Sequence, residues 1–229
     1  MADELPQGEE KTRQVRAMFD AIASRYELVN RLMTLGLDRR WRRRCVADLR
    51  LPDASLVLDV AAGTGDFTRE LTRQGHRAVA TDLSLGMLEA GSAMPERVQA
   101  DASRLPFRSA SFDGITCGYA LRNFSDLAAT FEEMARVTRP GGRLSLLEVA
   151  EPTSGLWRAG FRLWFRRVVP FIGSIVSDRA AYHYLPRSTA YLPAAEEVVR
   201  MLNRSGFSAV NNRRIMGGLS QQFVATRSL

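Results

Sequence analysis

Residues 56–66 read Leu56-Val57-Leu58-Asp59-Val60-Ala61-Ala62-Gly63-Thr64-Gly65-Asp66, and the rest of the chain is organised around them. An apolar run that carries one acid and ends in a Gly-x-Gly turn is typical of a buried parallel strand that stops against a ligand. The turn leads into Phe67-Thr68-Arg69-Glu70-Leu71, so we expect Asp66 or Thr64 to cap a helix whose free N–H groups face the same crevice. This arrangement predicts the nucleotide-cofactor end of a doubly wound α/β sheet.

Two further positions bear on which cofactor this crevice binds. A dinucleotide fingerprint needs a third glycine where this chain has Thr68, which weakens the case for a pyrophosphate. A second expected strand, residues 78–81, ends at Asp82, which would accept hydrogen bonds from the two hydroxyls of a ribose. The tight turn beside Asp59 suits a cofactor with a cationic amino-acid end and no phosphate. The pattern resembles motif I of the class I S-adenosylmethionine-dependent methyltransferases; the alternative is a buried strand and glycine turn that bind nothing.

Length and composition indicate one globular domain. The chain has 229 residues, 45% hydrophobic and 25% charged, which is enough for a core of its own and typical of a soluble protein. No stretch approaches the ~18 apolar residues of a membrane span, and the first residues do not resemble a signal peptide, so we expect a cytoplasmic protein. Cys45 and Cys117 stand far apart without a neighbouring Cys or His, so neither a disulfide framework nor a metal site is expected.

The net charge of +7 raises nucleic acid or anionic lipid as partners. The basic residues are almost all arginine, with Lys11 the exception, and such a preference can reflect genome composition rather than function. The sequence contains no aromatic-rich RNA-binding motif, helix-turn-helix spacing or zinc finger. We therefore expect no nucleic-acid partner.

The order of periodic segments predicts a helical leader followed by a mostly parallel sheet. Helical spacing covers residues 9–24 and a second piece at 25–33, and Asp38 is expected to cap a helix over 39–49. This leader, residues 9–50, would either pack on the sheet or cover the crevice as a lid. Strands and helices then alternate for about 90 residues, and a hairpin joined through Met216-Gly217-Gly218 completes seven strands.

Polar residues stand at the ends of the expected strands, where open α/β sheets bind ligands. After the second strand, Ser84 would cap a helix that places Met87 over an adenine. Asp101 follows the third strand, and the resemblance to the class I methyltransferases implies that such an acid binds the adenine amino group; the alternative is that it caps a turn. The fourth strand leads into Gly118-Tyr119-Ala120-Leu121-Arg122-Asn123-Phe124, which should face the reactive group of the cofactor.

The alternation stops between residues 152 and 191, which predicts a helical insertion. Aromatic residues recur there at helical spacing beside a face of arginines, which suits a membrane interface or the covering of an apolar substrate. Core packing or a dimer contact explains the same pattern nearly as well.

Four separated stretches share the order and spacing of one family. They are Tyr26-Glu27-Leu28-Val29-Asn30 with Leu35–Trp41, Tyr119–Asn123, Arg136–Gly142 with Glu148, and Tyr182–Leu185 with Ser188. Over residues 10–220 the chain resembles the ubiquinone/menaquinone-biosynthesis C-methyltransferases (UbiE/MenG). The resemblance implies methyl transfer from S-adenosylmethionine to a ring carbon of a polyprenylated hydroquinone, as from demethylmenaquinol to menaquinol. It departs at Glu27, where the family commonly has Asp, and at Gly118, where a hydroxyl residue is usual.

The resemblance implies that Thr64, Asp82, Asp101 and Ala102 contact the cofactor and that Gly63 and Gly65 shape its loop. Position at the strand ends adds Asp59, Leu83, Met87 and Gly118 as candidate cofactor-binding residues. The chemistry of the substrate indicates further roles: Arg122 would stabilise a developing phenolate as a permanently charged clamp, and Asn123 would orient a hydroxyl. The proton acceptor would be His183, with a water or Tyr26 as the alternative relay.

Three interpretations of function follow. The first is a quinol C-methyltransferase with a lipophilic substrate, peripheral membrane contact at the inner face and a possible homodimer. The second is a methyltransferase of another apolar phenol. The third is a basic membrane- or RNA-associated binding module that has kept the fold without catalysis.

Overall fold

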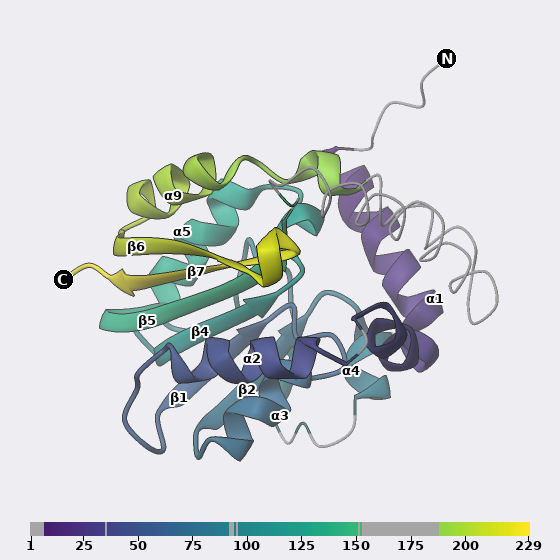
Figure 1. Cartoon of the computed structure of the whole chain (residues 1–229), viewed down its shortest axis with the longest axis horizontal. Coiled ribbons are helices and arrows are strands. Elements are labelled where there is room, and N and C mark those ends of the chain that lie inside the picture. Colours follow the sequence, from purple (N-terminus) through teal and green to yellow (C-terminus); the bar gives the residue numbers. More distant parts are fainter. Residues whose placement is uncertain (1–6, 35, 92–93, 95, 151, 153–187) are drawn as a thin grey trace.

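The computed structural model describes residues 7–34, 36–91, 94, 96–150, 152 and 188–229 (Figure 1). In this part of the chain seven strands form one sheet in the order β3-β2-β1-β4-β5-β7-β6. Their bounds are β1 Leu56–Val60, β2 Arg77–Asp82, β3 Arg97–Gln99, β4 Phe112–Gly118, β5 Thr138–Val149, β6 Phe207–Ile215 and β7 Ser220–Arg227. β7 is antiparallel to both of its neighbours, and the other pairings are parallel. The predicted seven-stranded, mostly parallel sheet is therefore confirmed.

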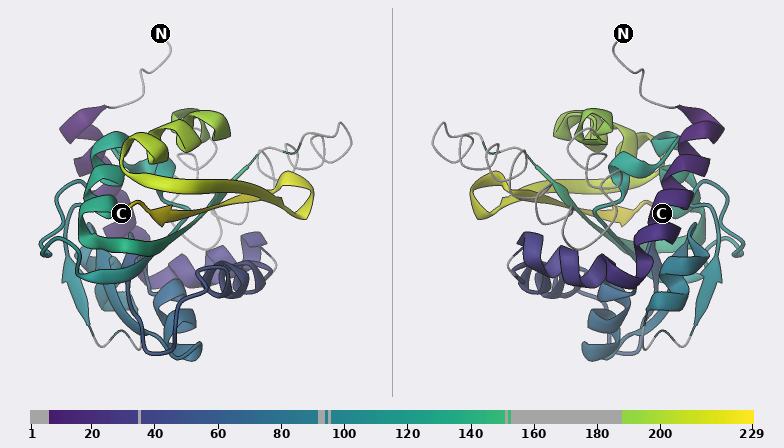
Figure 2. Two further views of the ribbon diagram at one scale, coloured as in Figure 1. Left: turned by 90° about the vertical axis from the view of Figure 1, so that its left-hand side faces the viewer. Right: turned by 90° about the vertical axis from the view of Figure 1, so that its right-hand side faces the viewer.

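Helices cover both faces of this sheet, as the two side views show (Figure 2). The helices are α1 Gly8–Thr34, α2 Asp38–Ala47, α3 Asp66–Arg73, α4 Leu85–Ala90, α5 Leu127–Val137 and α9 Ala195–Arg204, with 3-10 turns η1 Leu121–Asn123, η3 Thr189–Tyr191 and η4 Met216–Gly218. α2 and α3 lie on one face, α5 and α9 on the other, and α1 lies beside α4. The closing hairpin through η4 is confirmed.

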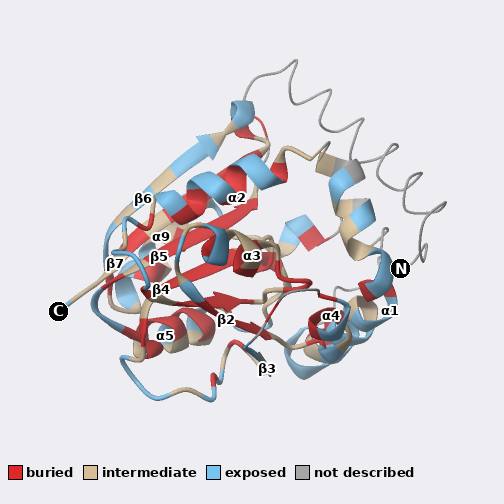
Figure 3. Ribbon diagram, turned by 90° about the horizontal axis from the view of Figure 1, so that it is seen from below, coloured by how far each residue is buried: buried red, intermediate tan, exposed pale blue. Residues whose placement is uncertain are grey.

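Strand β5 shows how the sheet builds two cores from alternating side chains. Leu144 and Leu146 are fully buried against α5 and α9, whereas Leu147 packs against α2 and α3. The period of two places successive residues on opposite faces, so a strand buried on both sides is apolar almost throughout. Figure 3 shows these buried strands between helices whose outer surfaces are exposed. The two layers hold the carboxyl ends of the strands in fixed positions.

Three local predictions are wrong. The leader is one continuous helix from Gly8 to Thr34 instead of two pieces. Neither Asp66 nor Thr64 caps α3: its N-cap is Gly65 in the left-handed conformation, and Asp66 is already helical. Asp38 likewise begins α2 rather than capping it. The physical reason is that both carboxylates pair with arginines, which competes with capping a backbone N–H. The predicted cap at Ser84 is confirmed, because its hydroxyl accepts from the N–H of Met87 at 3.0 Å.

The expected insertion, residues 152–191, falls almost entirely outside the described residues, as does His183. Among the helices that are described, none combines the length and apolarity that crossing a bilayer requires.

Candidate functional site

A cleft lies at the carboxyl ends of β1, β2 and β4. α1 contributes one wall through Thr12, Val15, Phe19 and Tyr26. Nine of the predicted site residues line it: Tyr26, Gly63, Asp82, Leu83, Met87, Asp101, Ala102, Gly118 and Asn123. Residues that the sequence places at the ends of separate strands therefore meet in one cleft beneath the leader helix.

Asp82 ties the glycine turn to the helix that follows β2. One carboxylate oxygen, Oδ2, accepts from the N–H of Gly63 at 2.8 Å, and Oδ1 accepts from the N–H of Ser84 at 2.8 Å. Burial raises the pKa of Asp82 from 3.8 to about 6, against the lowering effect of these N–H donors. The carboxylate keeps lone pairs free on each oxygen and can accept further hydrogen bonds from a ligand.

The glycine turn comes close to side chains on two other elements. Gly63 has φ +58°, and a Cβ built on it would lie 3.1 Å from Met87 Cε and 4.0 Å from the ring of Tyr26. A side chain at this position would push into the cleft, so only glycine leaves the space open. Tyr26 packs edge-on against Phe19 at 6.1 Å between ring centroids, and burial raises the pKa of its phenol. Tyr26 therefore stays protonated at neutral pH and can donate a hydrogen bond.

Asp101 both caps a turn and lines the cleft. Its Oδ1 accepts from the N–H and the hydroxyl of Ser103, each at 2.8 Å. The turn-capping alternative is therefore realised in the structure, and it fixes the carboxylate at the wall beside Ala102. The second oxygen, Oδ2, takes part in neither bond.

Arg122 is buried behind the cleft wall. It donates from Nη1 to the carbonyl of Tyr119 at 2.7 Å and to Glu148 Oε1 at 2.5 Å, and from Nε to the hydroxyl of Ser188 at 3.2 Å. Tyr119 lines the cleft with φ +59°, a conformation that non-glycine residues rarely adopt. The guanidinium already has a carboxylate partner, so it is less free than the isolated clamp that the sequence predicts.

Three candidate cofactor residues do not lie on the wall of the cleft. Asp59 is 1% exposed, and it accepts hydrogen bonds from Thr68 and Thr116 behind the turn. Thr64 is 2% exposed, and a Cβ on Gly65 would lie 2.4 Å from Met94 Sδ. These residues shape the turn from beneath.

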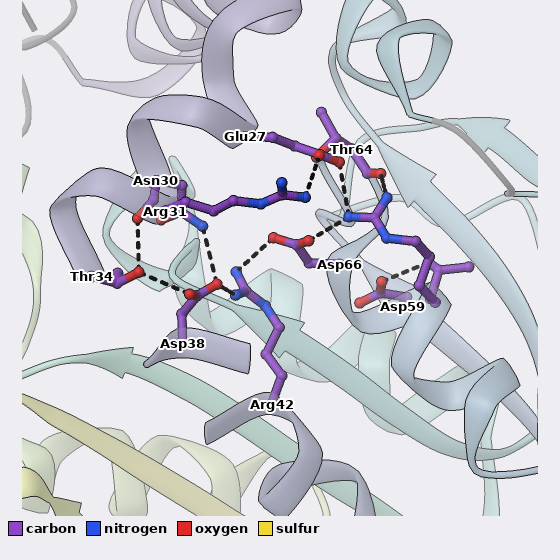
Figure 4. Close-up of polar contacts among 11 residues, drawn as sticks. Glu27, Asn30, Arg31, Thr34, Asp38, Arg42, Asp59, Thr64 and Asp66 are labelled. Carbon is purple, nitrogen blue, oxygen red and sulfur yellow. Dashed lines mark hydrogen bonds and ion pairs between the residues drawn. The ribbon is translucent and has the colours of Figure 1, made fainter. Parts of the chain in front are cut away.

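A network of charged residues joins the leader to the glycine turn (Figure 4). Arg69 donates to the carbonyl of Thr64 at 2.8 Å, to Glu27 on α1 at 2.8 Å and to Asp66. Arg42 is 5% exposed and pairs with Asp38 and with Asp66, the latter at 3.4 Å. The sequence alone does not predict this network, although Glu27 is part of the motif at residues 26–30. The only local signal is the 3- and 4-residue spacing of Asp38 with Arg42 and of Asp66 with Arg69.

Lys11, the one lysine of the chain, fixes the beginning of α1 to the far side of the cleft. Its ammonium donates to the carbonyl of Phe124 at 2.7 Å and lies 3.8 Å from the ring centroid of Tyr191. Desolvation lowers its pKa to about 8. The leader is thus attached on both sides of the cleft, at Lys11 and at Glu27.

Comparison with protein families matches residues 7–227 to the ubiE/COQ5 methyltransferase family. Two curated relatives bear the name demethylmenaquinone methyltransferase. The protein from Mycobacterium tuberculosis strain H37Rv is 42% identical over 209 residues, covering 90% of this chain and 89% of the relative. The protein from Deinococcus radiodurans is 44% identical over 209 residues, covering 87% of each.

Solved structures resemble this chain in fold. A SAM-dependent methyltransferase from Thermotoga maritima has a TM-score of 0.66 at 16% identity, covering 93% of this chain and 100% of that one. The [4+2]-cyclase SpnF has a TM-score of 0.70 at 14% identity, covering 95% and 96%. Because SpnF bears the name of a cyclase, the fold alone does not determine the reaction.

Proposed function

The chain belongs to the ubiE/COQ5 methyltransferase family, and from that premise we propose that it methylates a ring carbon of demethylmenaquinol, giving menaquinol. It is an S-adenosylmethionine-dependent methyltransferase, so the third interpretation, a binding module without catalysis, falls away. The observation that carries the proposal is the single cleft in which Gly63, Asp82 and Asp101 meet beneath α1. S-adenosylmethionine supplies the methyl group from a sulfonium centre.

The described residues fit that cofactor. Gly63 leaves open the space that a Cβ would fill, and Asp82 presents carboxylate oxygens with spare lone pairs beside it. We propose that Asp82 holds the ribose hydroxyls, that Asp101 and Ala102 contact the adenine, and that Met87 and Leu83 pack on it. Asp59, Thr64 and Gly65 would act from behind the turn by holding its shape.

The substrate end is proposed to lie between α1 and the loop after β4. Apolar side chains of Val15, Phe19 and Phe124 line the cleft there, which suits a ring with a lipophilic tail. A phenol carbon becomes a better nucleophile as its hydroxyl ionises, so the site must favour developing negative charge in line with the methyl group. Arg122 would supply that charge stabilisation, and Asn123 or Tyr26 would orient the hydroxyl.

The mass of the product tests the reaction. The protein is incubated anaerobically with S-adenosylmethionine carrying a deuterated methyl group and with demethylmenaquinol. We expect menaquinol that carries the label on the ring carbon. Absence of label from the quinol, together with label in another apolar phenol tested in parallel, would replace this proposal by the second interpretation.

Arg122→Ala tests the assignment of the catalytic loop. Removing the guanidinium should leave the affinity for S-adenosylhomocysteine within about threefold, because Arg122 is not on the cofactor wall, whereas methyl transfer should fall by about 10²-fold or more. Parallel losses of cofactor binding and turnover would contradict the assigned role. His183 remains a proposed proton acceptor, and His183→Gln should lower turnover without changing cofactor affinity.

A lipophilic substrate also requires access to a membrane, so we propose peripheral contact with the inner face of the bilayer. Flotation with vesicles of zwitterionic and of anionic lipid tests this contact. Recovery in the floating fraction is expected with anionic vesicles and less at high salt, because the net charge is +7. A homodimer is tested by sedimentation.

A further inference from the structure

Glu148 is a fully buried acid with one oxygen unused. It stands at the carboxyl end of β5, directly after Leu147, which pairs with the cleft residue Gly118. Its Oε1 accepts from Arg122 Nη1 at 2.5 Å and from the N–H of Val149 at 2.8 Å. Its Oε2 has no hydrogen-bond partner anywhere in the described part of the chain.

An unpaired carboxylate oxygen in a protein interior needs an explanation. Burying a polar group without a partner costs about 1–3 kcal/mol, and more for a charged one. Only four buried side-chain atoms among the described residues share this condition, and Glu148 Oε2 is the one that belongs to a carboxylate. In native structures the explanations for such a group include a catalytic role and a bound water or ion.

The surroundings of Glu148 connect it to the substrate side of the cleft. Arg122 bridges Glu148 and the backbone of Tyr119, so two hydrogen bonds separate the carboxylate from a residue that lines the cleft. The unpaired acceptor Oε2 thus belongs to a carboxylate that Arg122 joins to the wall of the cleft at Tyr119.

We propose that Glu148 Oε2 accepts a hydrogen bond from a hydroxyl group of the substrate and thereby selects a reduced quinol over an oxidised quinone. A hydroquinone offers O–H groups to a carboxylate, whereas the carbonyl oxygens of a quinone offer only lone pairs and are repelled by it. The inference rests on the proposed function and adds to it a residue that determines the redox state of the substrate. No bond is made or broken in this selection.

The fixed contacts of Oε1 make Glu148→Gln a sharp test. Because that position receives two N–H donors, the amide of the variant must place its oxygen there and its NH₂ at the Oε2 position. The substitution therefore converts the free acceptor into a donor without changing the size of the side chain. A donor at that position favours a carbonyl, so the preference should reverse.

The measurement compares the KM for demethylmenaquinol with the inhibition constant of demethylmenaquinone, both with a one-isoprene tail and under anaerobic conditions. In the wild-type protein we expect the quinone to bind at least tenfold more weakly than the quinol. In Glu148→Gln we expect the KM of the quinol to rise about tenfold and the inhibition constant of the quinone to fall. A merely structural role for Glu148 would weaken both ligands together.

Glu133→Gln is the matched control. Glu133 on α5 pairs with Arg136 at 2.6 Å, and their hydrogen bonds lead to Leu105, Phe107 and Ser109, none of which lines the cleft. Its substitution should leave the ratio of the two constants unchanged. Binding of S-adenosylhomocysteine verifies that each variant is folded.

The outcomes separate this inference from the proposed function. If the wild-type protein methylates demethylmenaquinol but binds quinol and quinone alike, or if Glu148→Gln leaves the ratio unchanged, the assignment of Oε2 is overturned. If no quinol is methylated at all, the proposed function fails first. Should Glu148→Gln not fold, equal binding of quinol and quinone by the wild-type protein would still overturn the assignment, and Glu148→Asp, which keeps the charge but withdraws the carboxylate, should reduce the preference for the quinol.

Discussion

Asp59→Asn should stabilise the protein at neutral pH while sparing the cofactor site. Asp59 is 1% exposed and accepts hydrogen bonds from the hydroxyls of Thr68 at 2.7 Å and Thr116 at 3.0 Å. Asparagine has the same shape, and a threonine hydroxyl can rotate to accept from the new NH₂ group. The substitution therefore removes a buried charge and leaves no polar group without a partner.

The size of the effect follows from the pKa of Asp59. Burial raises that pKa from 3.8 to about 7, so the folded state holds its proton where the unfolded state has lost it. The stability contributed by the protonated form is fully present below pH ~4 and is lost as the pH rises through 7. A difference of one pKa unit corresponds to about 1.4 kcal/mol, so the loss of unfolding free energy caused by the charged carboxylate is at most roughly 4 kcal/mol. We expect the advantage of the variant to grow by roughly 2–3 kcal/mol between pH 5 and pH 8.

Urea unfolding of both proteins at unit steps of pH measures this difference in unfolding free energy. Calorimetry measures the affinity of each protein for S-adenosylhomocysteine. The difference in unfolding free energy should rise up to pH ~7 and then level off. Affinity for S-adenosylhomocysteine should change by less than about threefold, because Asp59 is not on the cleft wall. A difference that does not vary with pH would refute the reasoning about charge. A tenfold loss of affinity would instead show direct contact with the cofactor.

Three further outcomes follow from the site. Burial places the pKa of Asp82 at about 6, so affinity for S-adenosylhomocysteine should fall about tenfold per pH unit below 6, and Asp82→Ala should abolish that dependence; a flat wild-type profile in calorimetry would contradict this. Gly118→Ala should lower stability by about 1–3 kcal/mol, because the added Cβ would lie 2.6 Å from the ring of Phe67; an unchanged unfolding midpoint would argue against it. Lys11→Met should speed amide hydrogen exchange over the first turns of α1, since it removes the bond to Phe124, whereas the exposed Arg13→Met should not. Equal exchange in the two variants would exclude an attachment at Lys11.

Local pattern was sufficient for the sheet and for most of the cleft. Apolar runs predict the strands. The rule that ligands bind at the carboxyl ends of strands predicts that Gly63, Asp82 and Asp101 share one site, as they do in the structure. These features are set by residues near one another in the chain. Only the order and handedness of the strands are then needed to place the predicted strand ends at one edge of the sheet.

The same reasoning failed where side chains choose between distant partners. Asp66 could cap its own helix or pair with an arginine, and besides Arg69 in the same helix it pairs with Arg42, 24 residues earlier. The partner of Glu27 is Arg69, on a different element. Glu148 was recognised as part of a motif, but its pairing with Arg122 depends on how β5 and η1 are packed. Spacing along the chain carries no information about such choices.

The attachment of α1 by Arg69 and Glu27 has a consequence for turnover. Both side chains remain about 30% exposed, so dissolved ions reach and screen their attraction. Since α1 forms a wall of the cleft, we expect the departure of spent cofactor to depend on how readily this helix lifts, and methyl transfer to take place while it is closed. We therefore expect added salt to accelerate the overall cycle when release is slowest and to leave a single turnover unaffected. Ionic strength would then control the rate of the overall cycle through one ion pair that takes no part in the methyl transfer itself.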